Sequence, residues 1–367
     1  MSTKPEIVAF HLPQFHCIPE NDEWWGKGFT EWDNTKKGIP LFNGHNQPRE
    51  PYGDNYYDLS RKEDLIWEMQ LAKKYGISAF CYYHYWFNGK LLLQKPLETM
   101  LTLEERIDYF FCWANEPWIR SWEGSKKILM PQNYGGQKEW QQHFDYLLPF
   151  FQDKHYRKIN GCPILVIYRS NNIPNCEEMI KYFDHCCKNN GFSGIYIIEE
   201  RNNFQTKSTC RNSNAILDFE PMFTLTHGRS KKMRVFDKIR TCLFNKKTKN
   251  NLLLFDYDKV WELILNRKYD DLKKHYLGAF VDWDNTARKG KNGTVVYGYT
   301  PEKFEKYLKK QVNRCQEYGS EMLFINAWNE WGEGTYLEPD KKYGFKNLEA
   351  VLKILSKIGM LTYEAKC

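Results

Sequence analysis

Short apolar runs alternate with longer amphipathic stretches along most of the chain. Each run holds about four apolar or β-branched residues, as a strand buried on both faces would. Helical spacing predicts helices over 61–76, 300–319 and 344–359. Strands and helices that alternate in this way predict a single closed (β/α)8 barrel over residues 1–367. The predicted strands lie within residues 6–13, 77–87, 107–118, 163–169, 194–200, 215–221, 277–285 and 321–331.

An open, doubly wound sheet is the alternative reading of the same alternation. Such a sheet often carries G-x-G-x-x-G after its first strand, where the glycines let the backbone approach a dinucleotide. No such motif follows the run at 6–13. The closed barrel is therefore favoured.

Polar and aromatic residues stand at the end of seven of the eight runs. Enzymes with this barrel build their sites at the C-terminal ends of the strands. We therefore expect these residues to meet on one rim. With the loop after the first strand, the predicted substrate contacts are His11, Gln14, Trp24, Trp25, Glu31, Trp32, Tyr83, His84, Trp86, Asn115, Asp282, Trp283, Asp284, Arg288, Trp328, Asn329 and Trp331.

The last run ends in the unusual stretch "FINAWNEWGEGTYLEPD", residues 324–340. Glu330 and Glu333 would face opposite sides of a regular strand, but Gly332 and Gly334 allow the backbone to turn there. A pair of carboxyl groups is what glycosidic chemistry needs, one as acid and one as base, nucleophile or charge stabiliser. Trp328 beside them would raise a carboxyl pKa by desolvation.

Aromatic residues make up 16% of the chain, including 13 Trp and 24 Tyr. Two readings stay open: faces that stack on sugar rings, or a large aromatic core. Trp24, Trp25 and Trp32 stand near Glu31 in the loop after the first run, a mixture that suits sugar binding. Arg288 either meets a phosphate or carboxylate of the substrate or pairs with Asp284.

The net charge of +7 is concentrated in residues 228–250. This segment has nine Lys or Arg and one Asp, so the remainder of the chain is close to neutral. General nucleic-acid binding would need a broad basic face and a recognition motif, so it is not expected. The segment reads as a basic insertion forming an amphipathic helix that contacts an anionic membrane or a lipid-linked diphosphate. The alternative is an insertion whose apolar side packs on the barrel.

The N-terminus carries no apolar signal core, and no run approaches the roughly 20 apolar residues of a membrane span. The 11 cysteines never form C-x-x-C. We therefore expect a cytoplasmic protein, membrane-associated at most, with free thiols and no zinc. No cofactor or metal is expected. The D-x-D pairs Asp282/Asp284 and Asp256/Asp258 leave Mn²⁺ or Mg²⁺ as an alternative.

Several long motifs carry a resemblance. "NEWGEG" at 329–334 is similar to the signature of the family 99 glycoside hydrolases, the endo-α-mannosidases. Most of the chain resembles the WbsX-type family of bacterial surface-polysaccharide biosynthesis proteins, a related group described as glycosyltransferases. The resemblance weakens over 200–260. It is carried by residues 11–34, 44–51, 80–90, 112–118, 278–290 and 324–340.

The resemblance implies a (β/α) barrel that acts on glycosidic bonds in O-antigen or capsule assembly. Its partner would be a glycan or an activated or lipid-linked sugar. Glu330 would be the base on the sugar's 2-hydroxyl and Glu333 the acid/base. Glu116, in an Asn-Glu pair like that of many retaining barrel glycosidases, is an alternative catalytic residue. An endo-acting α-glycoside hydrolase, or an inactive sugar-binding barrel, are the competing functions.

Overall fold

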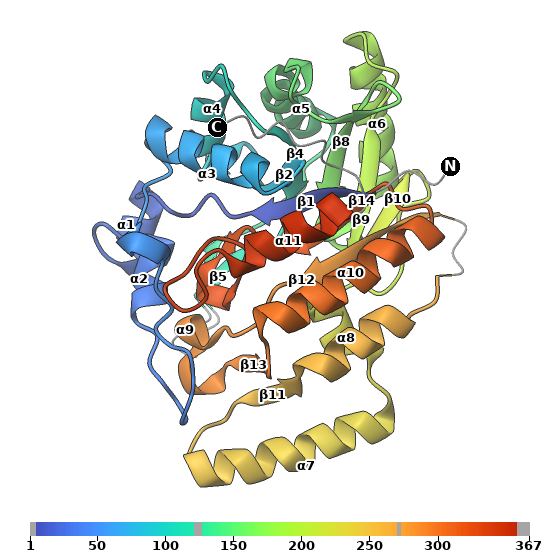
Figure 1. Cartoon of the computed structure of the whole chain (residues 1–367). Coiled ribbons are helices and arrows are strands. Elements are labelled where there is room, and N and C mark those ends of the chain that lie inside the picture. Colours follow the sequence, from blue (N-terminus) through green and yellow to red (C-terminus); the bar gives the residue numbers. More distant parts are fainter. Residues whose placement is uncertain (1–4, 121–126, 270–272, 358–367) are drawn as a thin grey trace.

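The computed structural model describes residues 5–120, 127–269 and 273–357. Within these residues, eight parallel strands close a barrel with helices around it (Figure 1). This confirms the predicted fold, and each predicted run contributes one strand. In chain order the strands are β1 (Glu6–His11), β2 (Ala79–Phe87), β4 (Asp108–Trp113), β8 (Cys162–Ile167), β9 (Tyr196–Arg201), β10 (Ala215–Asp218), β12 (Lys274–Phe280) and β14 (Met322–Asn326).

The barrel closes because β1 pairs with both β2 and β14. Ile325 of β14 stands opposite Ala9 of β1 on one side and Ala279 of β12 on the other. The parallel register brings the C-terminal ends of these strands to one rim. β1 and β14 are buried along most of their length, as strands covered on both faces must be.

The helices are amphipathic and cover the outside of the barrel (Figure 1). The predicted helices at 61–76, 300–319 and 344–359 are confirmed as α3, α10 and α11, apart from residues 358–359, which lie outside the described part of the chain. The longer helices are α3 (Lys62–Lys74), α4 (Lys95–Leu101), α5 (Gln137–Gln152), α6 (Cys176–Asn189), α7 (Lys231–Thr248), α8 (Tyr257–Asn266), α10 (Pro301–Glu317) and α11 (Lys346–Lys357).

Smaller elements decorate the rim and the edges of the barrel. They are α1 (Pro19–Trp25), α2 (Glu31–Lys36), α9 (Thr286–Lys289), β3 (Lys90–Leu92), β5 (Trp118–Arg120), β6 (Lys127–Met130), β7 (Lys158–Ile159), β11 (Leu253–Asp256), β13 (Thr294–Tyr297), β15 (Asn329–Glu330) and β16 (Thr335–Tyr336). The predicted basic insertion forms α7, which lies at the periphery beside β11 (Figure 1). No helix among the described residues has the length and apolar character to cross a bilayer.

The aromatic excess goes largely into the core. Of the tryptophans in the described part of the chain, nine are buried. Their indoles fill the spaces between strands and helices, where each buries a large apolar area. Of the two readings of the composition, the core therefore accounts for most of the rings. The buried tryptophans are Trp24, Trp32, Trp86, Trp113, Trp140, Trp261, Trp283, Trp328 and Trp331.

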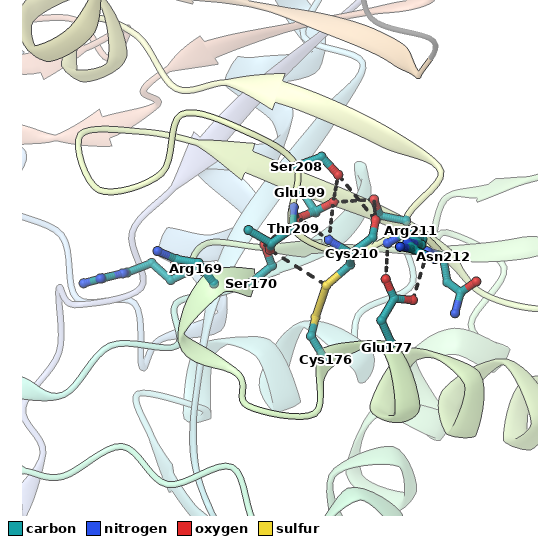
Figure 2. The surroundings of a disulfide bond; sticks show 12 residues. Arg169, Ser170, Cys176, Glu177, Glu199, Ser208, Thr209, Cys210, Arg211 and Asn212 are labelled. Carbon is teal, nitrogen blue, oxygen red and sulfur yellow. Dashed lines mark hydrogen bonds between the residues drawn. A yellow bond between two sulfur atoms is a disulfide. The ribbon is translucent and has the colours of Figure 1, made fainter.

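The expectation that every thiol is free is wrong, because Cys176 and Cys210 form a disulfide. It joins the first residue of α6 to the loop between β9 and β10 (Figure 2). The same loop is held by Glu199 of β9, whose carboxylate accepts the Thr209 backbone N–H at 2.8 Å. Sequence spacing gives no sign of this pair, because the fold alone brings two cysteines 34 residues apart into contact.

Candidate active site

The segment after β14 forms a tight hairpin at the barrel rim. β15 and β16 pair antiparallel, and a single helical turn, Trp331–Glu333, joins them. Gly334 ends this turn with φ +63°, a conformation that suits glycine. Gly332 has a different role, because a Cβ there would overlap the Glu31 carboxylate. The two glycines therefore make the turn and leave room for a charged neighbour.

Arg288 of α9 lies at the centre of this site. Its Nε donates to Glu31 Oε1 at 2.6 Å, and one terminal nitrogen donates to Glu330 Oε2 at 3.0 Å. Its other terminal nitrogen lies 2.9 Å from Glu333 Oε1. One guanidinium therefore holds Glu330 and Glu333 together, beside a third carboxylate. Asp284, the partner considered from the sequence, does not pair with Arg288.

The environment of Glu330 favours its neutral form. Its side chain is 8% exposed, whereas that of Glu333 is 25% exposed. Burial raises the pKa of Glu330 to about 8, and the negative charges of Glu333 and Glu31 add to this, while Arg288 opposes it. The same carboxylates raise the pKa of the buried Arg288 guanidinium, so it stays charged. The two carboxyl groups on Arg288 thus differ in solvent access.

A cavity of about 740 Å³ opens in front of these glutamates. The cavity is also lined by Glu116, which follows β4, and by Arg169, which follows β8 and donates to Glu116 at 2.6 Å. Burial raises the pKa of Glu116, and Arg169 opposes the rise. Glu116 and Glu330 thus face the same cavity on the same rim, as the barrel prediction requires.

Seven of the predicted contact or catalytic residues line this cavity together with the alternative Glu116. They come from the loop after β1, the end of β2, α9 and the hairpin, so the fold brings together what the sequence separates. These residues are Gln14, Trp25, Glu31, Tyr83, Arg288, Glu330 and Glu333.

The other predicted contacts do not line this cavity, so their direct contact with a sugar stays a prediction. Trp328 donates to Glu68 at 3.2 Å, and Asn329 holds both backbone groups of Leu12. Each is buried because its polar group already has a protein partner. The buried residues outside this cavity are His11, Trp24, Trp32, His84, Trp86, Asn115, Asp282, Trp283, Asp284, Trp328, Asn329 and Trp331.

The two histidines of this group are fully buried. His84 lies 2.9 Å from His143, nitrogen to nitrogen, and burial lowers its pKa to about 3. Burial lowers the pKa of His11 to about 3 as well. Both rings are neutral at physiological pH. They belong to the wall behind the cavity.

Asn115 supports the part of the cavity lined by Glu116 and Arg169. Its amide nitrogen donates to the Arg169 carbonyl at 2.9 Å, and its amide oxygen accepts the Arg169 N–H at 2.8 Å. This pair of bonds fixes the end of β8 against the end of β4. Asn115 therefore places Arg169 against Glu116.

The D-x-D residues are used for structure. Asp282 accepts from Arg49 at 2.8 Å, and Asp284 accepts from His45 at 2.8 Å and from Gln47 at 3.0 Å. Both carboxylates therefore already have protein partners.

The carboxylates of the second D-x-D pair, Asp256 and Asp258, also have protein partners. Asp256 caps the N-terminus of α8, and Asp258 is bound by Lys303 at 2.6 Å and by Tyr307 at 2.7 Å. Among the described residues, no group of three or more His, Cys, Asp or Glu side chains is arranged to hold a metal.

Sequence reasoning missed several lining residues, among them Tyr85, Trp118, Tyr168, Arg169 and Phe204. Tyr85 and Trp118 stand inside the motifs at 80–90 and 112–118, so their positions at strand ends could have identified them.

Sequence reasoning also missed Glu338, the third glutamate of residues 324–340. It is buried, and its carboxylate accepts from Trp331 at 2.5 Å and from Tyr57 at 3.0 Å. Burial, together with the nearby Glu68 carboxyl, raises its pKa well above the usual range. Glu338 therefore anchors the turn that carries Glu333.

A family comparison decides what kind of protein this is. The family described as Glycosyltransferase WbsX matches residues 7–351. The chain belongs to this WbsX glycosyltransferase family. Two proteins, each named uncharacterized protein WxcX, from Xanthomonas campestris pv. campestris strains B100 and ATCC 33913, are 32% identical over 360 residues. The match covers 96% of this chain and 50% of each relative, so this WbsX-family chain spans about half of their length.

Solved structures agree with the fold of this WbsX-family chain. A family 99 endo-α-mannosidase from Bacteroides thetaiotaomicron has a TM-score of 0.56 at 13% identity, covering 98% of both chains. A glycoside hydrolase-like protein has a TM-score of 0.57 at 12% identity, covering 96% of this chain and 94% of that one. At such identities the likeness concerns the fold, and it confirms the barrel.

Proposed function

We propose that this protein is a carbohydrate-active enzyme of bacterial surface-polysaccharide assembly, transferring a glycosyl group with a two-glutamate site. The observation that carries this is the placing of Glu330 and Glu333 on one arginine at the edge of a 740 Å³ cavity. A cavity of this size accommodates more than one sugar ring. Membership of the WbsX family supports transfer as the reaction.

In the proposed reaction the ionised Glu330 removes the proton from the sugar's 2-hydroxyl. The 2-oxygen then attacks C1, and the bond from C1 to the leaving oxygen breaks as Glu333 gives that oxygen a proton. In the second half, Glu333 removes a proton from the acceptor hydroxyl, whose oxygen opens the epoxide at C1. Glu330 returns its proton to the 2-oxygen. Arg288 keeps the two carboxyl groups near each other through both halves.

Hydrolysis is the alternative outcome of the same chemistry, since water replaces the acceptor hydroxyl. Two aromatic residues of the cavity, Trp118 and Phe204, support an acceptor sugar over bulk water, because such walls exclude water and stack on sugar faces. A second alternative pairs Glu330 with Glu116, which faces the same cavity. A third is a sugar-binding barrel without turnover.

The test is to incubate the purified full chain with nucleotide sugars, lipid-linked glycans and α-mannosides, each with and without EDTA. We expect turnover that survives EDTA and is lost in Glu330→Gln and in Glu333→Gln. The matched control is Glu105→Gln, which removes an exposed carboxylate and should leave turnover unchanged. Nucleotide release that EDTA abolishes would overturn the metal-free mechanism. Unchanged turnover in Glu333→Gln, with loss in Glu116→Gln, would transfer the acid/base role to Glu116.

The proposed partner is a glycan or a lipid-linked or otherwise activated sugar, and the proposed location is the cytoplasmic side of the membrane. The Cys176–Cys210 disulfide makes the location testable. Thiols of the protein should be trapped by alkylation directly in cells. A reduced pair agrees with the cytoplasm, whereas a fully oxidised pair would place the protein in an oxidising compartment.

A further inference from the structure

Four apolar side chains of α7 face the solvent. Val235, Phe236, Ile239 and Leu243 are 60%, 60%, 55% and 65% exposed. Val235, Ile239 and Leu243 are four residues apart, so they form one stripe along the helix, with Phe236 beside it. The sequence left open whether the apolar side of this insertion packs on the barrel. These four side chains do not pack on the barrel.

The other side of α7 is attached to the body of the protein, so the stripe cannot turn inward. Arg240 donates to the Leu254 carbonyl at 3.0 Å, and Asn245 donates to the Leu252 carbonyl at 2.9 Å. The rings of Phe244 and Phe42 lie 5.2 Å apart in an edge-to-face contact. These contacts fix the rotation of α7 about its own axis.

The charge around the stripe is almost purely positive. Residues 228–250 contain one acidic residue, Asp237, which forms ion pairs with Arg229 at 3.1 Å and with Arg240 at 3.0 Å. The remaining cations are exposed and flank the stripe or extend from the ends of α7. They are Lys231, Lys232, Arg234, Lys238, Lys246, Lys247 and Lys249.

We propose that this surface docks the protein onto an anionic phospholipid bilayer. An exposed apolar stripe alone would fit many partners, but here cations surround it, and anionic headgroups above an acyl layer match both features. The apolar side chains enter the boundary between headgroups and acyl chains, and the lysines contact phosphates. Each cation near such a surface strengthens binding about fivefold, so the cluster holds the protein reversibly. None of these residues lines the cavity, and the test needs no turnover.

The experiment is sedimentation of the full chain with vesicles of phosphatidylcholine, with or without about a third phosphatidylglycerol. The charge variant combines Lys231→Glu, Lys232→Glu, Lys246→Glu and Lys247→Glu. Its matched control combines Lys73→Glu, Lys306→Glu, Lys309→Glu and Lys310→Glu, which changes the net charge equally at exposed lysines of α3 and α10. A third variant, Phe236→Ser with Leu243→Ser, removes half of the apolar stripe and keeps every charge.

Wild type should bind the anionic vesicles and not the neutral ones, and added salt should weaken binding. The charge variant should bind at least a hundredfold more weakly, the control should stay within a few-fold of wild type, and the apolar variant should lose about tenfold. Equal binding by wild type and the charge variant would overturn the proposal, as would an equal loss in the control. If vesicles are not bound and the apolar variant converts a dimer into monomers, the surface holds a second copy of this chain instead.

Discussion

The high pKa of Glu330 predicts that this residue makes the fold less stable as the pH rises. An unfolded glutamate loses its proton near pH 4.5, whereas folded Glu330 keeps its proton until about pH 8. Between these values the folded protein binds the extra proton, so raising the pH favours the unfolded state. The stabilisation that protonated Glu330 contributes is fully present below pH 4.5 and is lost as the pH rises through about 8.

The magnitude follows from the two pKa values. At about 1.4 kcal/mol for each pH unit, the change from pH 5 to pH 8 costs the wild type about 3 to 4 kcal/mol through Glu330 alone. Glu330→Gln cannot ionise and avoids this loss. For a chain of 367 residues, this free energy corresponds to about 4 to 5 °C in Tm.

Thermal unfolding followed by circular dichroism at pH 5, 6, 7 and 8, at constant ionic strength, measures the effect. The Tm of Glu330→Gln should rise relative to wild type by those 4 to 5 °C between pH 5 and pH 8. Glu105→Gln, at an exposed position, should keep a constant difference from wild type. A constant difference for Glu330→Gln, or one that falls with pH, would refute the reasoning and show that Arg288 stabilises the carboxylate more than burial disfavours it.

Further predictions concern the same site and its supports. If Glu330 is the base, kcat/KM should rise about fivefold from pH 7 to pH 8 as its ionised fraction grows, and an unchanged rate would argue against that role. Arg288→Met should lower the free energy of unfolding by about 3–5 kcal/mol at pH 8, measured by urea denaturation, because it leaves buried carboxylates without their cation. Glu338→Gln should keep near wild-type stability, since the amide still accepts from Trp331, whereas Glu338→Leu should lose about 2–4 kcal/mol. Replacing Cys176 and Cys210 by Ser should lower the free energy of unfolding by about 3–4 kcal/mol relative to the oxidised wild type. The same variant should equal the wild type whose disulfide has been reduced.

Sequence by itself determined the barrel and the rim that carries the candidate site. Strands buried on both faces need uninterrupted apolar runs, and those runs are visible without a structure. Because parallel strands end on one rim, the polar residues after them were bound to gather there. For the same reason the sequence predicts Glu330, Glu333 and Glu116 on one rim. The basic amphipathic helix was also visible, since charge and 3.6-residue spacing are local properties.

Tertiary structure decided which of the polar and aromatic residues reach the cavity. Trp25 and Trp32 stand seven residues apart in one motif, yet Trp25 lines the cavity and Trp32 is buried behind it. Arg288 pairs with Glu31, Glu330 and Glu333 and not with the nearby Asp284. Packing determines which side chains far apart in the sequence come into contact, and a local sequence pattern carries no information about such contacts. The Cys176–Cys210 pair and the outward stripe of α7 were decided in the same way, because burial depends on what the rest of the chain places alongside.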